Sequence, residues 1–135
     1  MMDVNAEPLR SVLLSAREAR DNAYAPYSKF KMGAAILTES GEIVCGSLVE
    51  NISLGLAMCS ERVAFFSAVS SCSARPKILA LHAPKTGGRL TWPCGACLQV
   101  AREFAGPDLI IVATDGVDVG TATLGELGPH LPSKT

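Results

Sequence analysis

The alternation of short apolar segments along the chain most constrains its fold. From Glu7 to Ala23, apolar residues recur at the three- and four-residue spacing of an amphipathic helix. Two strand candidates follow, "KMGAAILT" (31–38) and "EIVCGSLV" (42–49). Gly41, in the "ESGE" stretch between them, suits a tight hairpin turn. The first third of the chain therefore predicts one helix followed by a hairpin.

The remainder of the chain continues this alternation. A helix is predicted from about Cys59 to Val69, apolar on most of its faces and therefore expected to be buried. A second helix is predicted to start near Cys94. The strand candidates here are "KILALHA" (77–83), "DLIIVAT" (108–114) and "GVDVGTATL" (116–124), the last followed by a short tail. Strands alternating with helices predict an α/β protein, a three-layer α/β/α sandwich.

Length and charge narrow the class of protein. A chain of 135 residues, 48% of them apolar, predicts a single domain over residues 1–135. The formal net charge of −1 comes without a basic run, which argues against a nucleic acid polymer or an anionic membrane as partner. The first residues lack the pattern of a signal peptide, and no apolar run approaches the length of a membrane span. We therefore expect a cytoplasmic protein.

The cysteines are the residues that most directly suggest chemistry. Their number is odd in a chain large enough to fold without disulfides, which favours packing, metal ligation or catalysis. Cys59 and Cys94 each begin a predicted helix, where free N–H groups and the helix dipole favour a thiolate. Cys97 lies one turn after Cys94, so both can bind one ion, and Cys59 could supply a third ligand. Three protein ligands leave a position for water, as in a catalytic zinc site. The five cysteines are Cys45, Cys59, Cys72, Cys94 and Cys97.

Two neighbours of Cys59 favour the catalytic interpretation. The motif "PCGAC" alone also suits a redox pair or half of a structural zinc knuckle. Glu61, however, lies where its carboxylate can reach a zinc-bound water and act as general acid/base, although the helix dipole alone also favours a first-turn glutamate. Arg62 is either an ordinary surface cation or a partner that offsets the net negative charge of a zinc ion with three thiolates.

The combination of Cys-x-Glu with Pro-Cys-x-x-Cys resembles the zinc-dependent nucleoside deaminases. Among these, the chain is most similar to the small cytidine deaminases over roughly residues 8–128. The segments that match the pattern of that family, in order and at similar spacing, are "PYSKFKMGAAI", "VEN", "GLAMCSERVAFFSAV" and "PCGACLQVAREF".

The resemblance implies roles for individual residues. Cys59, Cys94 and Cys97 would bind one Zn²⁺ per subunit. Glu61 would shuttle protons, and Arg62 would hydrogen-bond to the ligand thiolates. The resemblance also implies a five-stranded mixed sheet within the sandwich, and a homotetramer with sites shared between subunits, a dimer being the alternative.

The resemblance further implies a pyrimidine salvage enzyme that binds a cytosine nucleoside. It would hydrolyse cytidine and 2′-deoxycytidine to uridine and 2′-deoxyuridine and release ammonia. Phe30 would lie beside the nucleoside, unless it is simply a core aromatic at the start of a strand. Glu50 would bind the ribose 3′-hydroxyl, unless it is a solvated acid at a strand end. Backbone N–H groups at Ser60 and nearby are expected to hold the ring edge.

Three departures from the family pattern affect these expectations. Leu48 stands where the family usually has asparagine, and Leu98 where it usually has arginine. No aromatic residue follows Phe104, although most members carry one near the C-terminus that reaches the base in a neighbouring subunit. The metal centre is therefore expected to be intact and the substrate pocket to be altered.

Two alternative functions remain open on this basis. Leu48 and the lost aromatic favour an aminohydrolase for a modified cytosine nucleoside of the blasticidin-S type. The other alternative is a non-enzymatic zinc domain in which a further side chain closes the fourth metal position. The residues that could do so are Cys45, Cys72, His82 and His130.

Overall fold

Five strands form one mixed sheet in a computed structural model that describes residues 3–71 and 74–134. The sheet order is β2-β1-β3-β4-β5. Strands β3 and β4 are parallel, and the other neighbouring pairs are antiparallel. The predicted five-stranded mixed sheet is thus confirmed. The strands are β1 (Gly33–Thr38), β2 (Ile43–Ser47), β3 (Pro76–His82), β4 (Ile110–Thr114) and β5 (Val119–Thr123).

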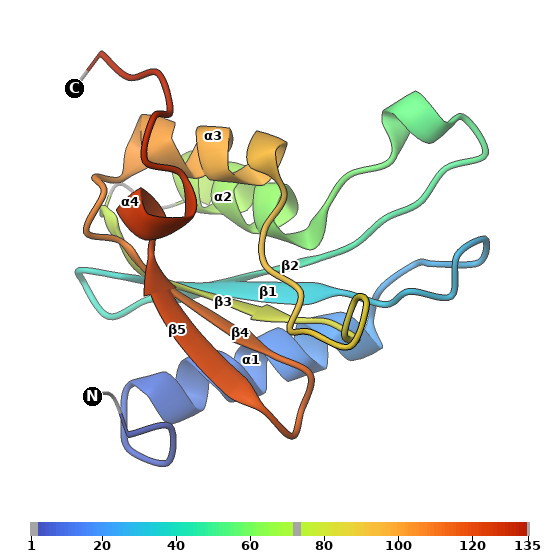
Figure 1. The fold of residues 1–135 in the computed structure, drawn as a ribbon, viewed down its shortest axis with the longest axis horizontal. Helices are drawn as coiled ribbons and strands as arrows, with labels where there is room; N and C mark the ends of the chain where they lie inside the picture. Colours follow the sequence, from blue (N-terminus) through green and yellow to red (C-terminus); the bar gives the residue numbers. More distant parts are fainter. Residues whose placement is uncertain (1–2, 72–73, 135) are drawn as a thin grey trace.

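Helices cover both faces of this sheet. Helix α1 (Leu9–Asp21) lies on one face, and α2 (Ser60–Ser71) and α3 (Gly95–Phe104) lie on the other (Figure 1). A short 3-10 helix, η1 (Leu54–Leu56), lies in the long connection between β2 and α2. The three-layer α/β/α sandwich is therefore confirmed. Within the described residues, no helix combines the length and apolarity needed to span a membrane.

The sheet separates two apolar cores. On β1, Ala34 and Ile36 belong to the cluster beneath α2 and α3, whereas Ala35 and Leu37 belong to the cluster beneath α1. This is the two-residue alternation of a strand that is covered on both faces. In α1, the buried residues follow helical spacing, as the sequence predicts. They are Leu9, Val12, Ala16 and Ala19.

Two glycines let helices approach the sheet at backbone distance. A Cβ atom on Gly33 would lie 2.0 Å from the backbone nitrogen of Arg20, so α1 requires a glycine there. A Cβ atom on Gly46 would lie 2.3 Å from the backbone nitrogen of Ala64 and 2.4 Å from the Ser60 carbonyl oxygen. The second contact places the first turn of α2 directly against the end of β2.

The structure corrects two expectations. The expectation that α2 is buried on most faces is wrong, because Phe66 and Val69 are 47% and 51% exposed. The expected C-terminal tail instead begins with helix α4 (Leu124–Leu127), which lies on the same face as α3. Thr123 accepts a hydrogen bond from the backbone N–H of Glu126, and the Glu126 side chain accepts one in return from the Thr123 N–H. This capping box stabilises a helix too short to show periodicity.

Candidate metal centre and active site

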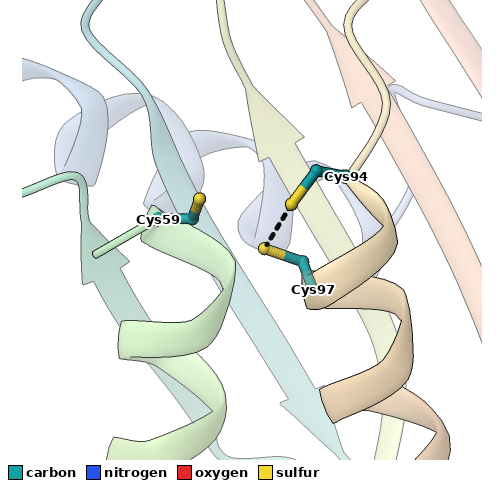
Figure 2. Close-up of side chains that lie close together, drawn as sticks. All are labelled: Cys59, Cys94 and Cys97. Atoms are coloured by element: carbon teal, nitrogen blue, oxygen red, sulfur yellow. Dashed lines mark hydrogen bonds between the residues drawn. The ribbon is translucent and has the colours of Figure 1, made fainter. Parts of the chain in front are cut away.

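The starts of α2 and α3 bring the predicted metal ligands together. Cys59 precedes α2, and its carbonyl accepts a hydrogen bond from Val63 at 3.1 Å. Cys94 is the N-cap of α3, and its carbonyl accepts one from Leu98 at 2.9 Å. Cys97 lies in the first turn of α3. Figure 2 shows the three cysteines at these two helix starts, with the thiols of Cys94 and Cys97 pointing toward each other.

The spacing of the three sulfurs fits a zinc ion. The Sγ atoms of Cys59, Cys94 and Cys97 lie within 4.8 Å of one another, and those of Cys94 and Cys97 are 3.5 Å apart. Tetrahedral zinc with Zn–S bonds of about 2.3 Å requires sulfurs about 3.8 Å apart. Thiolates are also ligands that zinc prefers, so both the donor type and the geometry fit the metal.

No further ligand closes this cluster within residues 3–71 and 74–134. Cys45, His82 and His130 do not belong to the group of ligand atoms that contains the three cysteines. Cys72, the remaining candidate for a fourth ligand, lies outside the described residues. A site with three cysteine ligands retains a position for water, as a catalytic zinc site requires.

The electrostatics around Cys59 favour its thiolate form. Interaction with the Cys97 thiol lowers the pKa of Cys59 to about 5, and the Arg62 guanidinium lowers it too, against the opposite effect of burial. The pKa of Cys97 is raised, because this thiol donates to Cys59 and because it is buried. Arg62 Nη2 donates to the Cys59 sulfur at 3.4 Å, which raises the pKa of Arg62 and keeps it charged. Metal binding would release the remaining thiol protons.

Glu61 is buried beside the cluster. Its side chain is only 1% exposed, which distinguishes it from a solvated first-turn glutamate. Burial raises the pKa of Glu61, and a hydrogen bond from the Ser60 hydroxyl to Oε1, 2.8 Å long, acts in the opposite direction. A carboxylate whose pKa is raised is a stronger base than an exposed glutamate, which suits a group that accepts a proton from water. The sequence did not predict this contact of the Ser60 side chain.

A backbone pairing places the predicted substrate-binding residues beside the metal ligands. Val49 donates to the Met58 carbonyl at 3.1 Å, and Met58 donates back to Val49 at 2.9 Å. Met58 immediately precedes Cys59, so the segment that carries Leu48 and Glu50 runs next to the cluster. Leu48 is buried, with 8% of its surface exposed.

Glu50 is fixed in place and is not a free solvated acid. Its carboxylate accepts hydrogen bonds from the backbone N–H groups of Tyr27 (3.0 Å) and Ser28 (3.2 Å) and from the Ser28 hydroxyl. The Ser28 hydroxyl is the main cause of the lowered pKa of Glu50. Phe30 donates its backbone N–H to the same hydroxyl at 3.0 Å and lies outside both core clusters. The role of Ser28 is not evident in the sequence, because its partner lies 22 residues away.

The two other departures from the family pattern have different structural settings. Leu98 is 8% exposed and belongs to the core between α2, α3 and the sheet, so its side chain packs and does not face solvent. The C-terminal segment runs back along α3, where Gln99 donates to the Pro132 carbonyl at 2.9 Å. His130, in that segment, is exposed.

Comparison with known proteins yields a consistent set of relatives. A family profile described as the cytidine and deoxycytidylate deaminase zinc-binding region matches residues 7–114. A cytidine deaminase from Sporosarcina psychrophila is 39% identical over 127 residues, which cover 93% of this chain and 92% of the relative. A blasticidin-S deaminase from Bacillus cereus is 31% identical over 76% of each chain. The crystal structure of cytidine deaminase from Burkholderia pseudomallei has a TM-score of 0.84 and 39% identity, covering 91% of this chain and 98% of that one.

Proposed function

Because this chain belongs to the cytidine and deoxycytidylate deaminase family, we propose that it is a zinc-dependent enzyme that converts cytidine and 2′-deoxycytidine to uridine and 2′-deoxyuridine. The observation that carries this proposal is the convergence of three cysteine sulfurs beside the buried carboxyl group of Glu61. Water is the second substrate, and ammonia is the second product.

The three cysteines and Arg62 form the metal-binding part of the site. When bound by the three thiolates, zinc supplies a Lewis acid that makes a hydroxide equivalent available near neutral pH. Three thiolates would leave the zinc centre with a net negative charge. That charge would oppose the loss of a proton from a water molecule there. The Arg62 guanidinium, in contact with Cys59, offsets this charge and makes the sulfur a weaker base.

Glu61 carries the protons. It takes a proton from the attacking water and delivers it to N3 of the cytosine ring while the oxygen adds at C4. It then takes the remaining proton from the hydroxyl group on C4 and passes it to the amino group, the C4–N bond breaks as the C4 carbonyl forms, and ammonia leaves. The hydrogen bond from Ser60 orients the carboxylate, and burial raises its pKa, which strengthens it as a proton acceptor.

The nucleoside would bind along the segments that adjoin Cys59. Glu50 is held ionised by donors from Tyr27 and Ser28, so a carboxylate oxygen is available to accept from the ribose 3′-hydroxyl. Phe30 follows Ser28 closely and would contact the nucleoside, and the Ser60 backbone would hold the ring edge. These assignments rest on the resemblance to the family and on the proximity of the segments.

Leu48→Asn is expected to improve the handling of the nucleoside sugar. A neutral hydrogen bond contributes roughly 0.5–1.5 kcal/mol, which corresponds to a roughly two- to tenfold increase in kcat/KM for cytidine. Steady-state kinetics on cytidine and on free cytosine measure this effect. Cytosine has no sugar, so its kcat/KM should be unchanged. If wild type already turns over cytidine rapidly and the substitution has no effect, Leu48 is a neutral replacement.

A second candidate function is hydrolysis of a modified cytosine nucleoside of the blasticidin-S type. It is favoured by the buried Leu48 and by the similarity to the Bacillus cereus blasticidin-S deaminase. The loss of absorbance on deamination gives kcat/KM for cytidine, 2′-deoxycytidine and blasticidin S. Comparing the three values separates the two functions. We expect the highest kcat/KM for the unmodified nucleosides, and a clear preference for blasticidin S would reverse the assignment.

We also propose that the enzyme is a homotetramer. Large apolar side chains are exposed on α2 and on the connection that precedes it, which is typical of a surface covered by another subunit.

Sedimentation equilibrium should give four times the 14.1 kDa mass of one chain. Phe66→Glu should dissociate the tetramer, whereas Val117→Glu, on a distant exposed turn, should not. A dimeric or monomeric wild type would contradict the proposal. The exposed residues are Val49, Ile52, Leu54, Leu56, Phe66 and Val69.

We place the enzyme in the cytoplasm, with a small nucleoside as its partner. A reducing compartment keeps the ligand cysteines available as thiolates for the metal. The balanced surface charge, with a net value of −1, does not favour a nucleic acid polymer or an anionic membrane.

A further inference from the structure

A basic pocket lies at the end of β3, on the face of the sheet covered by α1. Ile78 and Ala80 of β3 belong to the core beneath α1, so His82, two residues further along, faces the same side. The catalytic cysteines lie at the starts of helices on the opposite face. The cavity has a volume of about 230 Å³ and is lined by Arg20, Lys29, Lys31, His82, Pro84 and Asp115.

The pocket contains buried polar groups that lack a partner. His82 is 4% exposed, and neither of its ring nitrogens has a hydrogen-bond partner among the described residues. Arg20 Nε is also buried without a hydrogen bond there, because its contact with Asp21 Oδ1, at 3.5 Å, forms an ion pair without hydrogen-bond geometry. Buried polar atoms of this kind are normally satisfied. The unpaired Arg20 Nε–H therefore indicates a missing acceptor, and the unpaired His82 ring indicates a missing polar partner.

The charge around His82 is predominantly positive. Burial lowers the pKa of this imidazole, and the charges of Arg20 and Arg17 lower it further, while Asp21 and Asp115 act in the opposite direction. A cation in this cavity would meet three cationic side chains and one carboxylate, whereas an anion would be attracted by the excess positive charge. The charged groups that surround the imidazole are Arg10, Arg17, Arg20 and Asp21 of α1, Lys29 and Lys31 of the following segment, and Asp115 after β4.

The backbone of the lining segment is also unusual. Lys29 has a φ of 61°, a left-handed conformation that is uncommon for a residue other than glycine, asparagine or aspartate. Such conformations persist where the surrounding structure enforces them, and they are frequent at ligand-binding sites. Here, this conformation occurs in a segment in which both Lys29 and Lys31 line the cavity.

We propose that this pocket binds an oxyanion of the phosphate class. Lys29 and Lys31 would contribute ammonium donors, Arg20 would contribute its buried Nε–H, and a protonated His82 ring would complete the set. Donors from four side chains match the several acceptor oxygens of a tetrahedral anion. The anion is either free phosphate or the phosphate group of a nucleotide. The site lies next to the nucleoside-binding segment, because Lys29 and Lys31 flank Phe30.

The two histidines of the chain provide a direct test. Ring ¹H–¹⁵N correlation spectra of the zinc-loaded, histidine-labelled protein are recorded during titration with inorganic phosphate, with uridine 5′-monophosphate, and with sodium chloride at matched ionic strength. We expect a saturable shift of the His82 signals and a rise in the pKa of His82 with a phosphate compound but not with chloride. Exposed His130 is the internal control. The compound with the higher affinity identifies the source of the anion.

A charge-removal variant tests the lysines in the same experiment. Lys29→Met combined with Lys31→Met should weaken binding of the phosphate compound at least about tenfold, because two charge-assisted contacts are lost. Lys77→Met, which removes one charge at the start of β3, should leave the affinity unchanged. The proposal is overturned if the His82 signals of the wild type respond to neither phosphate compound beyond the chloride effect. It is also overturned if the folded double variant binds the phosphate compound as tightly as wild type does. If that variant does not fold, the response of His82 in the wild-type protein alone supports or overturns the proposal.

Discussion

Replacing Glu61 with glutamine is expected to lower cytidine turnover by about 10²–10⁴-fold, the contribution typical of a general acid/base, or by more, because one carboxylate would make several proton transfers. Glutamine preserves the size of the side chain and its ability to accept the hydrogen bond from Ser60. It cannot take up and release protons. The fold and the zinc content should therefore remain those of wild type, and only the rate should fall.

The measurement is kcat for cytidine together with zinc analysis of the same preparation. Glu103→Gln, at an exposed position on α3, is the matched control and should retain wild-type turnover. Residual activity of Glu61→Gln within a few-fold of wild type would eliminate the proposed role of this residue. Loss of zinc together with activity would assign Glu61 to the metal site instead.

We expect that replacing any one of Cys59, Cys94 and Cys97 with alanine removes the zinc. Each sulfur is one of the three proposed protein ligands, so a variant with two ligands should no longer retain the metal through purification. Activity should be lost with it. Elemental analysis of each purified variant, expressed as zinc per chain, measures the effect.

Cys45→Ala is the matched control for these variants. Its Sγ atom lies 3.8 Å from the Ser15 carbonyl oxygen and does not belong to the ligand cluster, so the variant should keep its zinc. The sequence leads to the same expectation for Cys72→Ala, although Cys72 lies outside the described residues. Retention of zinc by the Cys94 variant, or its loss from the Cys45 variant, would contradict the assignment of ligands.

The architecture was predictable because its signals are local. The strands are short apolar runs, the first helix has clear periodicity, and each ligand cysteine is positioned by the start of a helix. Helix α2 differs from these elements. Its apolarity indicated burial, but a sequence pattern does not distinguish the core of one chain from an exposed apolar surface such as that around Phe66.

The features missed by sequence analysis depend on distant partners. Ser28 and Glu50 meet only because the chain folds back between them, and no spacing rule relates the two residues. In the sequence, His82 suggests only a further metal ligand, whereas the structure places it among the arginines of α1 and the lysines that precede β1. Helix α4 is four residues long, so only the capping box of Thr123 and Glu126 could have revealed it.

On the proposed function, this chain uses zinc to hydrolyse the amino group of cytidine. The most direct test follows uridine and ammonia during incubation of the zinc-loaded protein with cytidine, then repeats the assay after removal of the metal and again after zinc is restored. Uridine and ammonia should form in equal amounts, production should stop in the zinc-free protein, and it should resume with zinc. A zinc-loaded protein that leaves cytidine unchanged, or turnover that persists without the metal, would contradict the claim.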